Sequence, residues 1–269
     1  VVVTEKGLNG SFRSFTFDTT SVYNKEAGLF YYPGQLVYKG EFKVPSNLSD
    51  NDYTYTVTIT NKLTGKVVSA DTKLVKNFTV ETPRPGQQSI NFTMESNQRI
   101  KWNSAKDGKR YNVAIRFWFD EDLKQSTDTL HRYIDWEFSS VKSSSIQGGE
   151  PLEIVYTPGN FFNVCKNLIP YKDGDALSED NVQARLVNRI EFLFSVAGDE
   201  LNTYMEVNEP SSGIVQEKPE YSNITNGIGL FSCRYTKTTE TSAVKMKVGP
   251  STEERLMNEG LKFVKKIGN

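Results

Sequence analysis

Residues 111–119 read YNVAIRFWF, and this stretch decides the fold class of the chain. Every second position from Tyr111 to Phe119 is apolar or aromatic, whereas the positions between them are Asn, Ala, Arg and Trp. Side chains of a β-strand point alternately to the two faces of its sheet, so this repeat predicts a strand with one buried face. Residues 53–59, YTYTVTI, show the same repeat. The sequence therefore predicts antiparallel, half-buried strands and an all-β protein.

The composition supports this prediction and argues against a nucleic acid partner and against a membrane-spanning helix. Of the 269 residues, 37% are hydrophobic and 12% are aromatic, which suffices for one large or two modest cores. The formal net charge is −1 and no basic stripe is present, so we expect no nucleic acid partner. No run of about 18 apolar residues occurs, so we expect no membrane-spanning helix.

A segment rich in proline and glycine, PRPG at residues 83–86, marks the predicted domain boundary, because two prolines cannot continue a central strand. We expect an N-terminal β-sandwich over residues 1–82, a larger sandwich over 83–250, and a short helix with a tail over 251–269. The expected strands are 12–17, 35–44, 53–61, 66–73 and 78–82 in the first domain and 89–95, 99–102, 111–119, 130–139, 152–156 and 187–196 in the second, with a short helix at 198–207.

Two local patterns suggest the type of sandwich. The polar residues 48–52, followed by two tyrosines, resemble the tyrosine corner of immunoglobulin-like folds. A strand ending in Trp102, an alanine-containing turn and then Tyr-x-Val-x-Ile resemble the centre of a fibronectin type III domain. The resemblance implies two immunoglobulin- or fibronectin-III-like β-sandwiches, the second enlarged by insertions and short helices. A generic hairpin is the alternative for the first.

Residues 218–235, KPEYSNITNGIGLFSCRY, predict a hairpin with a type I′ turn at Asn226 and Gly227. This segment has an aromatic residue with Ser-Asn, then Asn-Gly-Ile-Gly and a second aromatic residue. The pattern resembles the C-terminal signature of a group of Bacteroidetes surface lipoproteins of unknown function. Residues 188–210 and 53–74 resemble other elements of that family.

This resemblance implies an exported protein of the outer membrane or cell surface, anchored by an N-terminal lipidated cysteine that is not present in this chain. It also implies association with a TonB-dependent receptor. The chain begins at Val1, and we expect that an N-terminal segment such as a signal peptide was removed. We expect a non-catalytic binding or accessory module for nutrient capture, with a glycan or peptide ligand and no cofactor. A structural or adhesive surface protein and a carbohydrate-active hydrolase are the alternatives.

Few residues suggest catalysis. His131 is the only histidine, and no Gly-x-Ser-x-Gly motif marks a nucleophilic serine. Asp135 and Glu137 share one face of a predicted strand, where two carboxylates could serve glycoside hydrolysis. Arg116 or Arg132 could instead neutralise these carboxylates. We therefore predict no catalytic residues and no enzyme activity.

The spacing of the possible metal ligands and of the two cysteines leads to two further expectations. His-x-x-x-His and Cys-x-x-Cys are both absent, which argues against zinc. The acidic loop with Asp173, Asp175, Glu179 and Asp180 offers oxygen ligands that calcium accepts, but it lacks the EF-hand register. We interpret it as a solvated loop and expect no metal site. Cys165 and Cys233 lie in apolar, strand-like stretches. They either form a disulfide, which would stabilise by about 4 kcal/mol in the chain-entropy model, or pack as free thiols.

The remaining candidate is a binding surface. Arg116 and Trp118 lie on the strand face opposite the apolar row, and a Trp beside an Arg is enriched in contact sites. Arg132 and Trp136 share one face of the strand at 130–139, and we expect them to extend this patch. The alternative is that insertion loops cover both tryptophans.

Overall fold

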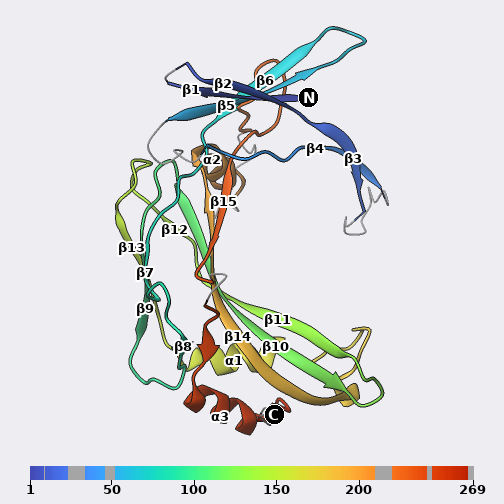
Figure 1. The fold of residues 1–269 in the computed structure, drawn as a ribbon, viewed down its shortest axis with the longest axis vertical. Helices are drawn as coiled ribbons and strands as arrows, with labels where there is room; N and C mark the ends of the chain where they lie inside the picture. Colours follow the sequence, from blue (N-terminus) through green and yellow to red (C-terminus); the bar gives the residue numbers. More distant parts are fainter. Residues whose placement is uncertain (9, 24–33, 46–51, 210–219, 241–243, 266–269) are drawn as a thin grey trace, which may run out of the picture. The chain divides into compact units, whose positions relative to one another are not determined.

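The computed structural model describes residues 1–8, 10–23, 34–45, 52–209, 220–240 and 244–265 (Figure 1). Strands account for 44% of these described residues and helices for 13%, so the all-β prediction is confirmed. The chain divides into two compact units. Unit 1 comprises residues 1–77, 105–109 and 197–235, and unit 2 comprises 78–104, 110–196 and 236–269. Each unit is thus assembled from three separate stretches, whereas the sequence predicted continuous domains.

Unit 1 is organised around a four-stranded antiparallel sheet. Its strand order is β2 (Phe12–Thr16), β1 (Val2–Gly7), β5 (Tyr53–Thr60) and β6 (Val67–Thr72). A separate antiparallel pair joins β3 (Asp18–Val22) to β4 (Gln35–Lys39), and helix α2 spans Asp199–Asn208. The strands β2, β4, β5 and β6 and the helix lie where the sequence predicted them.

Strand β1 was missed because a carboxylate occupies one of its inward positions. Val3 and Glu5 are 4% and 3% exposed, so the charge of Glu5 interrupts the apolar pattern of a strand. The structure compensates this charge with side chains from two other strands. Arg13 donates two hydrogen bonds of 2.7 and 2.6 Å to the Glu5 carboxylate, and the Tyr55 hydroxyl donates a third of 2.8 Å.

The core of unit 1 is aromatic. Val3, Tyr53 and Tyr55 form its buried centre, and Phe17, Phe42, Val57, Leu74 and Phe231 pack against them. The predicted polar corner falls largely on residues 46–51, which lie outside the described residues. The Tyr55 phenol bonds to Glu5 of β1, so this tyrosine joins two strands.

Unit 2 contains the strand that the alternation in residues 111–119 predicts. Strand β10 (Arg110–Leu123) lies between β11 (Thr129–Glu137) and β14 (Val182–Ala197), with β15 (Arg234–Thr238) beside β14 and β12 (Val141–Lys142) also paired with β10. The unit 2 parts of β14 and β15 are residues 182–196 and 236–238. All five apolar residues from Tyr111 to Phe119 are at most 2% exposed, which confirms the predicted buried row.

Three smaller groups of elements complete unit 2. A three-stranded antiparallel sheet has the order β13 (Pro151–Tyr156), β9 (Gln98–Asn103) and β7 (Val80–Thr82). Strand β8 (Ser89–Ile90) pairs in parallel with β16 (Lys247–Val248). The helices are α1 (Asn160–Leu168), α3 (Pro250–Asn258) and the 3₁₀ turn η1 (Glu179–Asn181).

Helix α1 corrects the strand-like interpretation of the residues around Cys165. Phe161, Phe162 and Cys165 are buried, and Cys165 follows the two phenylalanines by four and three positions, the spacings at which residues share a face of a helix rather than of a strand. The structure holds Cys165 and Cys233 as free, buried thiols, so the candidate disulfide is not formed. Cys165 belongs to unit 2 and Cys233 to unit 1, where its Sγ accepts a hydrogen bond from the Val75 amide.

The predicted hairpin at Asn226 and Gly227 is not formed as a regular type I′ turn. Asn226 has φ of +61°, but Gly227 is not among the residues with positive φ. The segment contacts β6 through an isolated bridge between Thr225 and Ser69 and through a 3.4 Å hydrogen bond from the Asn226 amide group to the Val67 carbonyl. Side chains replace the strand pairing. The Asn223 amide group bonds both the carbonyl and the N–H of Phe231, at 2.7 and 2.9 Å.

Candidate functional site

The outer face of the β11–β10–β14 sheet in unit 2 carries a compact group of aromatic and charged side chains. The antiparallel register sets Trp118 opposite Tyr133 and Arg116 opposite Asp135. The Trp118 and Tyr133 ring centres are 4.8 Å apart, and the guanidinium carbon of Arg116 lies 3.9 Å from the centre of the Tyr133 ring. Directly opposed residues on one sheet face are the pairs that stabilise each other, so the register builds this arrangement.

An ion pair orients Arg116 on this face. Its Nε and Nη2 donate hydrogen bonds of 2.7 and 2.8 Å to the two carboxylate oxygens of Asp135. These bonds raise the pKa of Arg116 above its usual value. A bidentate pair fixes the plane of the guanidinium, so that plane stays stacked on Tyr133.

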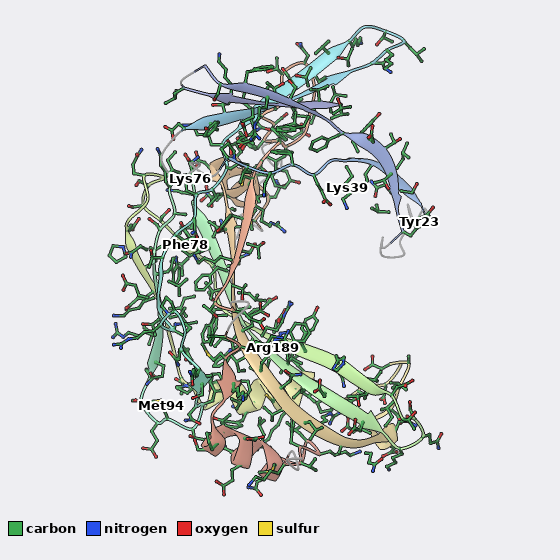
Figure 2. The ribbon with its side chains drawn as sticks, in the orientation of Figure 1. Tyr23, Lys39, Lys76, Phe78, Met94 and Arg189 are labelled. Carbon is green, nitrogen blue, oxygen red and sulfur yellow. The ribbon has the colours of Figure 1, made fainter. Side chains whose placement is uncertain are left out.

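Strand β14 contributes two further residues to this group, Arg189, which is labelled in Figure 2, and Glu191. The guanidinium carbon of Arg189 lies 4.2 Å from the Trp118 ring centre, and its Nε lies 3.2 Å from an oxygen of Glu240. The indole N–H of Trp118 donates to Glu191, whose second oxygen accepts from the Thr238 hydroxyl at 2.7 Å. Trp118 is therefore half-buried by neighbours on its own sheet face.

We call this group the outer-face cluster; its members are Arg116, Trp118, Tyr133, Asp135, Arg189 and Glu191. Tyr133 is 49% exposed and presents the most accessible large ring of the cluster. Its neighbours are already held by hydrogen bonds and stacking, so little side-chain entropy remains to be lost on contact with a partner. The cluster can therefore offer an aromatic surface, fixed guanidinium groups and carboxylate acceptors together.

The other two predicted binding residues lie on the opposite sheet face. Trp136 pairs with Ile115 and Arg132 pairs with Phe119, which places both on the side of the buried apolar row. Trp136 packs among Phe92, Phe138, Tyr156 and Phe161. The predicted patch of four residues is thus divided between two faces of the sheet. The alternation within β11 shows which residues share a face, but only its register against β10 decides which of these faces lies beside Trp118.

Arg132 belongs to a buried ionic network. Its Nη1 donates a 2.7 Å hydrogen bond to Glu121, which is fully buried. The same carboxylate accepts from Arg185 Nε at 2.8 Å and from the Tyr171 hydroxyl at 2.6 Å. Arg185, also fully buried, makes two further bonds to Glu179 at 2.6 and 2.7 Å. The charges of the two arginines and the two glutamates compensate one another, so the network has a structural role in the interior of unit 2.

Two of the candidate catalytic residues, His131 and Asp135, have structural partners. His131 lies on edge strand β11 and is exposed, with Nδ1 2.7 Å from Asp120. Both oxygens of Asp135 accept from Arg116, as the sequence suggested, while Glu137 is exposed. Within the part of the chain that the structure describes, no three His, Cys, Asp or Glu side chains are grouped to hold a metal ion. In the acidic loop, Asp175 accepts a hydrogen bond from the Lys172 amide.

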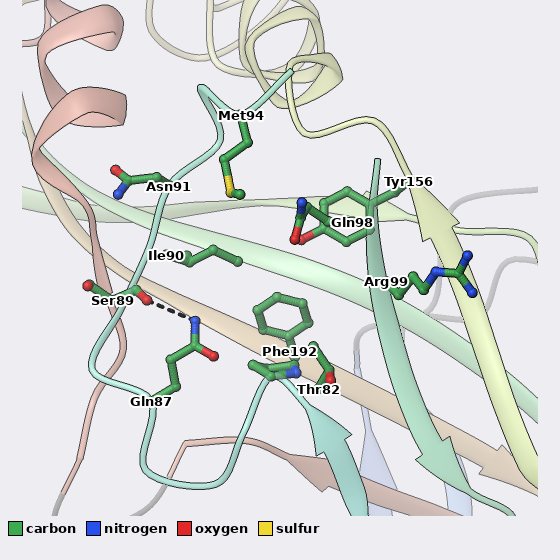
Figure 3. Close-up of a pocket in the computed structure, with 11 residues that line it drawn as sticks. Thr82, Gln87, Ser89, Ile90, Asn91, Met94, Gln98, Arg99, Tyr156 and Phe192 are labelled. Carbon is green, nitrogen blue, oxygen red and sulfur yellow. Dashed lines mark hydrogen bonds between the residues drawn. The ribbon is translucent and has the colours of Figure 1, made fainter. Parts of the chain in front are cut away.

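A cavity of about 270 Å³ in unit 2 is a second candidate (Figure 3). Ile90, Met94, Tyr156 and Phe192 supply apolar walls, and Gln98 lies among them. Drug-sized ligands usually occupy about 300–1,000 Å³, so this cavity suits a smaller molecule. Its charged lining residue Arg99 is already paired with Glu153 at 2.8 Å.

Comparisons with known proteins give no further assignment: no family model matches the chain, and no curated protein shows significant similarity to it. The helices in the described residues are all too short or too polar to cross a bilayer.

Proposed function

We propose that this protein is a non-catalytic binding module of the cell surface, and that the outer-face cluster contacts a protein partner. The observation that carries the proposal is the half-exposed Tyr133 ring stacked on Arg116, beside Trp118 stacked on Arg189. Trp, Tyr and Arg are the residues that dominate binding energy in protein interfaces. Their preorganisation on a rigid sheet favours recognition over chemistry.

The resemblance to surface lipoproteins supports the cellular part of this proposal. On that basis the mature protein is anchored in the outer membrane through an N-terminal lipid, and its partner is a TonB-dependent receptor. The two units would then be immunoglobulin- or fibronectin-III-like modules that present the cluster. A peptide segment of the receptor is the ligand that we favour, because planar guanidinium and carboxylate groups suit peptide backbone and side chains.

The test is an affinity capture of the lipidated protein from its own outer membrane, followed by mass spectrometry. We expect the unmodified protein to recover the receptor in equal amount and Tyr133→Ser to recover less than about a tenth of it, since loss of a hot-spot residue costs about 2 kcal/mol or more. Tyr38→Ser is the matched control, because Tyr38 is 54% exposed but lies on β4 of unit 1.

Capture of the protein alone would contradict the receptor assignment. A screen of glycans would follow, with the same pair of variants. Equal binding by Tyr133→Ser and Tyr38→Ser to every retained ligand would exclude the outer-face cluster as the contact surface.

A further inference from the structure

Unit 1 contains a buried lysine and a buried aspartate that face each other. Lys76 and Asp107 have side chains only 3% and 6% exposed, and Lys76 Nζ lies 3.8 Å from Asp107 Oδ2. Figure 2 labels Lys76. The Lys76 amide donates a 2.9 Å hydrogen bond to the Lys106 carbonyl, so the backbone itself holds the two stretches together. The two residues belong to separate stretches of the chain, residues 1–77 and 105–109.

The two polar groups are not satisfied as an ordinary ion pair. Neither Lys76 Nζ nor Asp107 Oδ2 has a hydrogen-bond partner among the described residues. A charge-assisted hydrogen bond of this kind normally closes to about 2.7–2.9 Å. An uncompensated buried charge costs several kcal/mol, so burial shifts both groups toward their neutral forms. Burial accordingly lowers the pKa of Lys76 and raises the pKa of Asp107.

A neutral amine beside a protonated carboxyl group is the reactant pair for amide formation. The amine then has a free electron pair, and the carboxyl group has a hydroxyl that can leave as water. Asp107 also has φ of +63°, a conformation that residues other than glycine adopt infrequently, so the surrounding structure determines its position. The burial of both side chains and the fixed backbone of Asp107 therefore hold the two reacting groups next to each other.

We propose that Lys76 and Asp107 join through an intramolecular isopeptide bond. Lys76 Nζ attacks Asp107 Cγ, a new N–C bond forms, and the C–O bond to the hydroxyl breaks. One proton of the amine leaves with that hydroxyl as a single water molecule. No oxidant, reductant or other co-reactant is needed, and the product is a neutral amide.

Proximity favours this condensation. Well-oriented groups in one molecule reach effective molarities of about 10⁵–10⁸ M, which exceeds the molarity of water. The site is buried, so little water is available for the reverse reaction. The amide also removes two ionisable groups that the interior does not satisfy, and it links the segment after β6 to the segment before β10 covalently.

The test is the mass of the intact, denatured protein together with a tryptic map. We expect the chain to be lighter than its sequence mass by one water molecule. Trypsin does not cleave after a modified lysine or before proline, so the map should contain residues 74–99 joined to residues 107–109 as one branched peptide. An unchanged intact mass would overturn the proposal.

The location of the lost water matters because Asp107 precedes Gly108. An Asp-Gly sequence can cyclise to a succinimide, which also releases one water but leaves a linear peptide. Water loss confined to a linear peptide that contains Asp107 would therefore overturn the proposal. Lys76→Met should restore the full sequence mass. The control Lys106→Met should keep the loss of one water and the branch, but its shorter arm becomes residues 102–109 because one tryptic site is removed.

Discussion

The guanidinium carbon of Arg189 lies 4.2 Å from the centre of the Trp118 ring, so a cation–π contact links strands β14 and β10 of unit 2. The guanidinium carbon of Arg116 lies 5.6 Å from the Trp118 ring centre, and the Tyr133 ring centre lies 4.8 Å from it. The tryptophan is therefore held in one position on an otherwise polar sheet face.

Replacing Arg189 with Met should destabilise the protein by about 1 kcal/mol, because a partly desolvated cation–π contact is lost. Urea unfolding measures this change. Arg99→Met is the control, since Arg99 pairs with Glu153 on an exposed surface, with side chains 54% and 41% exposed. Its loss should cost less than about 0.5 kcal/mol. Equal effects of the two substitutions would show that stacking on Trp118 contributes nothing.

Replacing Glu121 with Gln should destabilise the protein by about 3–5 kcal/mol, because Arg185 would be left buried without its full counter-charge. The measurement is again the free energy of unfolding in urea. The exposed Glu137→Gln should change that free energy by no more than about 0.5 kcal/mol. A small effect at Glu121 would mean that water reaches the network.

Glu5 should contribute a pH-dependent part of stability. Burial raises the pKa of Glu5, but the hydrogen bonds from Arg13 and Tyr55 outweigh it and leave this pKa below the ordinary value of 4.5. A lowered pKa in the folded state stabilises above the unfolded pKa, and this stabilisation is lost as the pH falls through the folded value.

The stability difference between the unmodified protein and Glu5→Gln should therefore shrink as the pH is lowered from about 6 to about 3. Unfolding in urea across that range provides the measurement. The control is Glu41→Gln, whose side chain is 82% exposed. A difference that grows toward acid would reverse the assigned sign.

Both cysteines should resist alkylation in the native protein. Burial raises the pKa of the Cys165 thiol and that of the Cys233 thiol, which keeps both in the unreactive thiol form. Iodoacetamide should label neither in the folded state and both after unfolding without reductant. Failure to label after unfolding would reveal a disulfide, contrary to the two free thiols in the structure.

Part of the candidate site could be predicted from the sequence. Arg116 and Trp118 follow from the repeat of two in residues 111–119, which separates them from the apolar row. Tyr133 and Arg189 could not be assigned to the same face, because their positions depend on the register of β11 and β14 against β10. For the same reason, Arg132 and Trp136 were assigned to the wrong face.

The sequence alone determined the all-β class and most of the strands. Alternation within one strand is a local property, since neighbours in the chain must point to opposite faces. Helix α1 was the local exception, because a short apolar run fits a helix or a strand equally well.

Only the tertiary structure decided which distant residues meet. Glu5 is acceptable inside β1 because Tyr55 and Arg13 reach it from other strands. Lys76 and Asp107 face each other because the fold brings together stretches that the sequence separates. Such pairs depend on strand register and on the free energy of burying charge, and neither quantity is expressed in the local pattern of a chain.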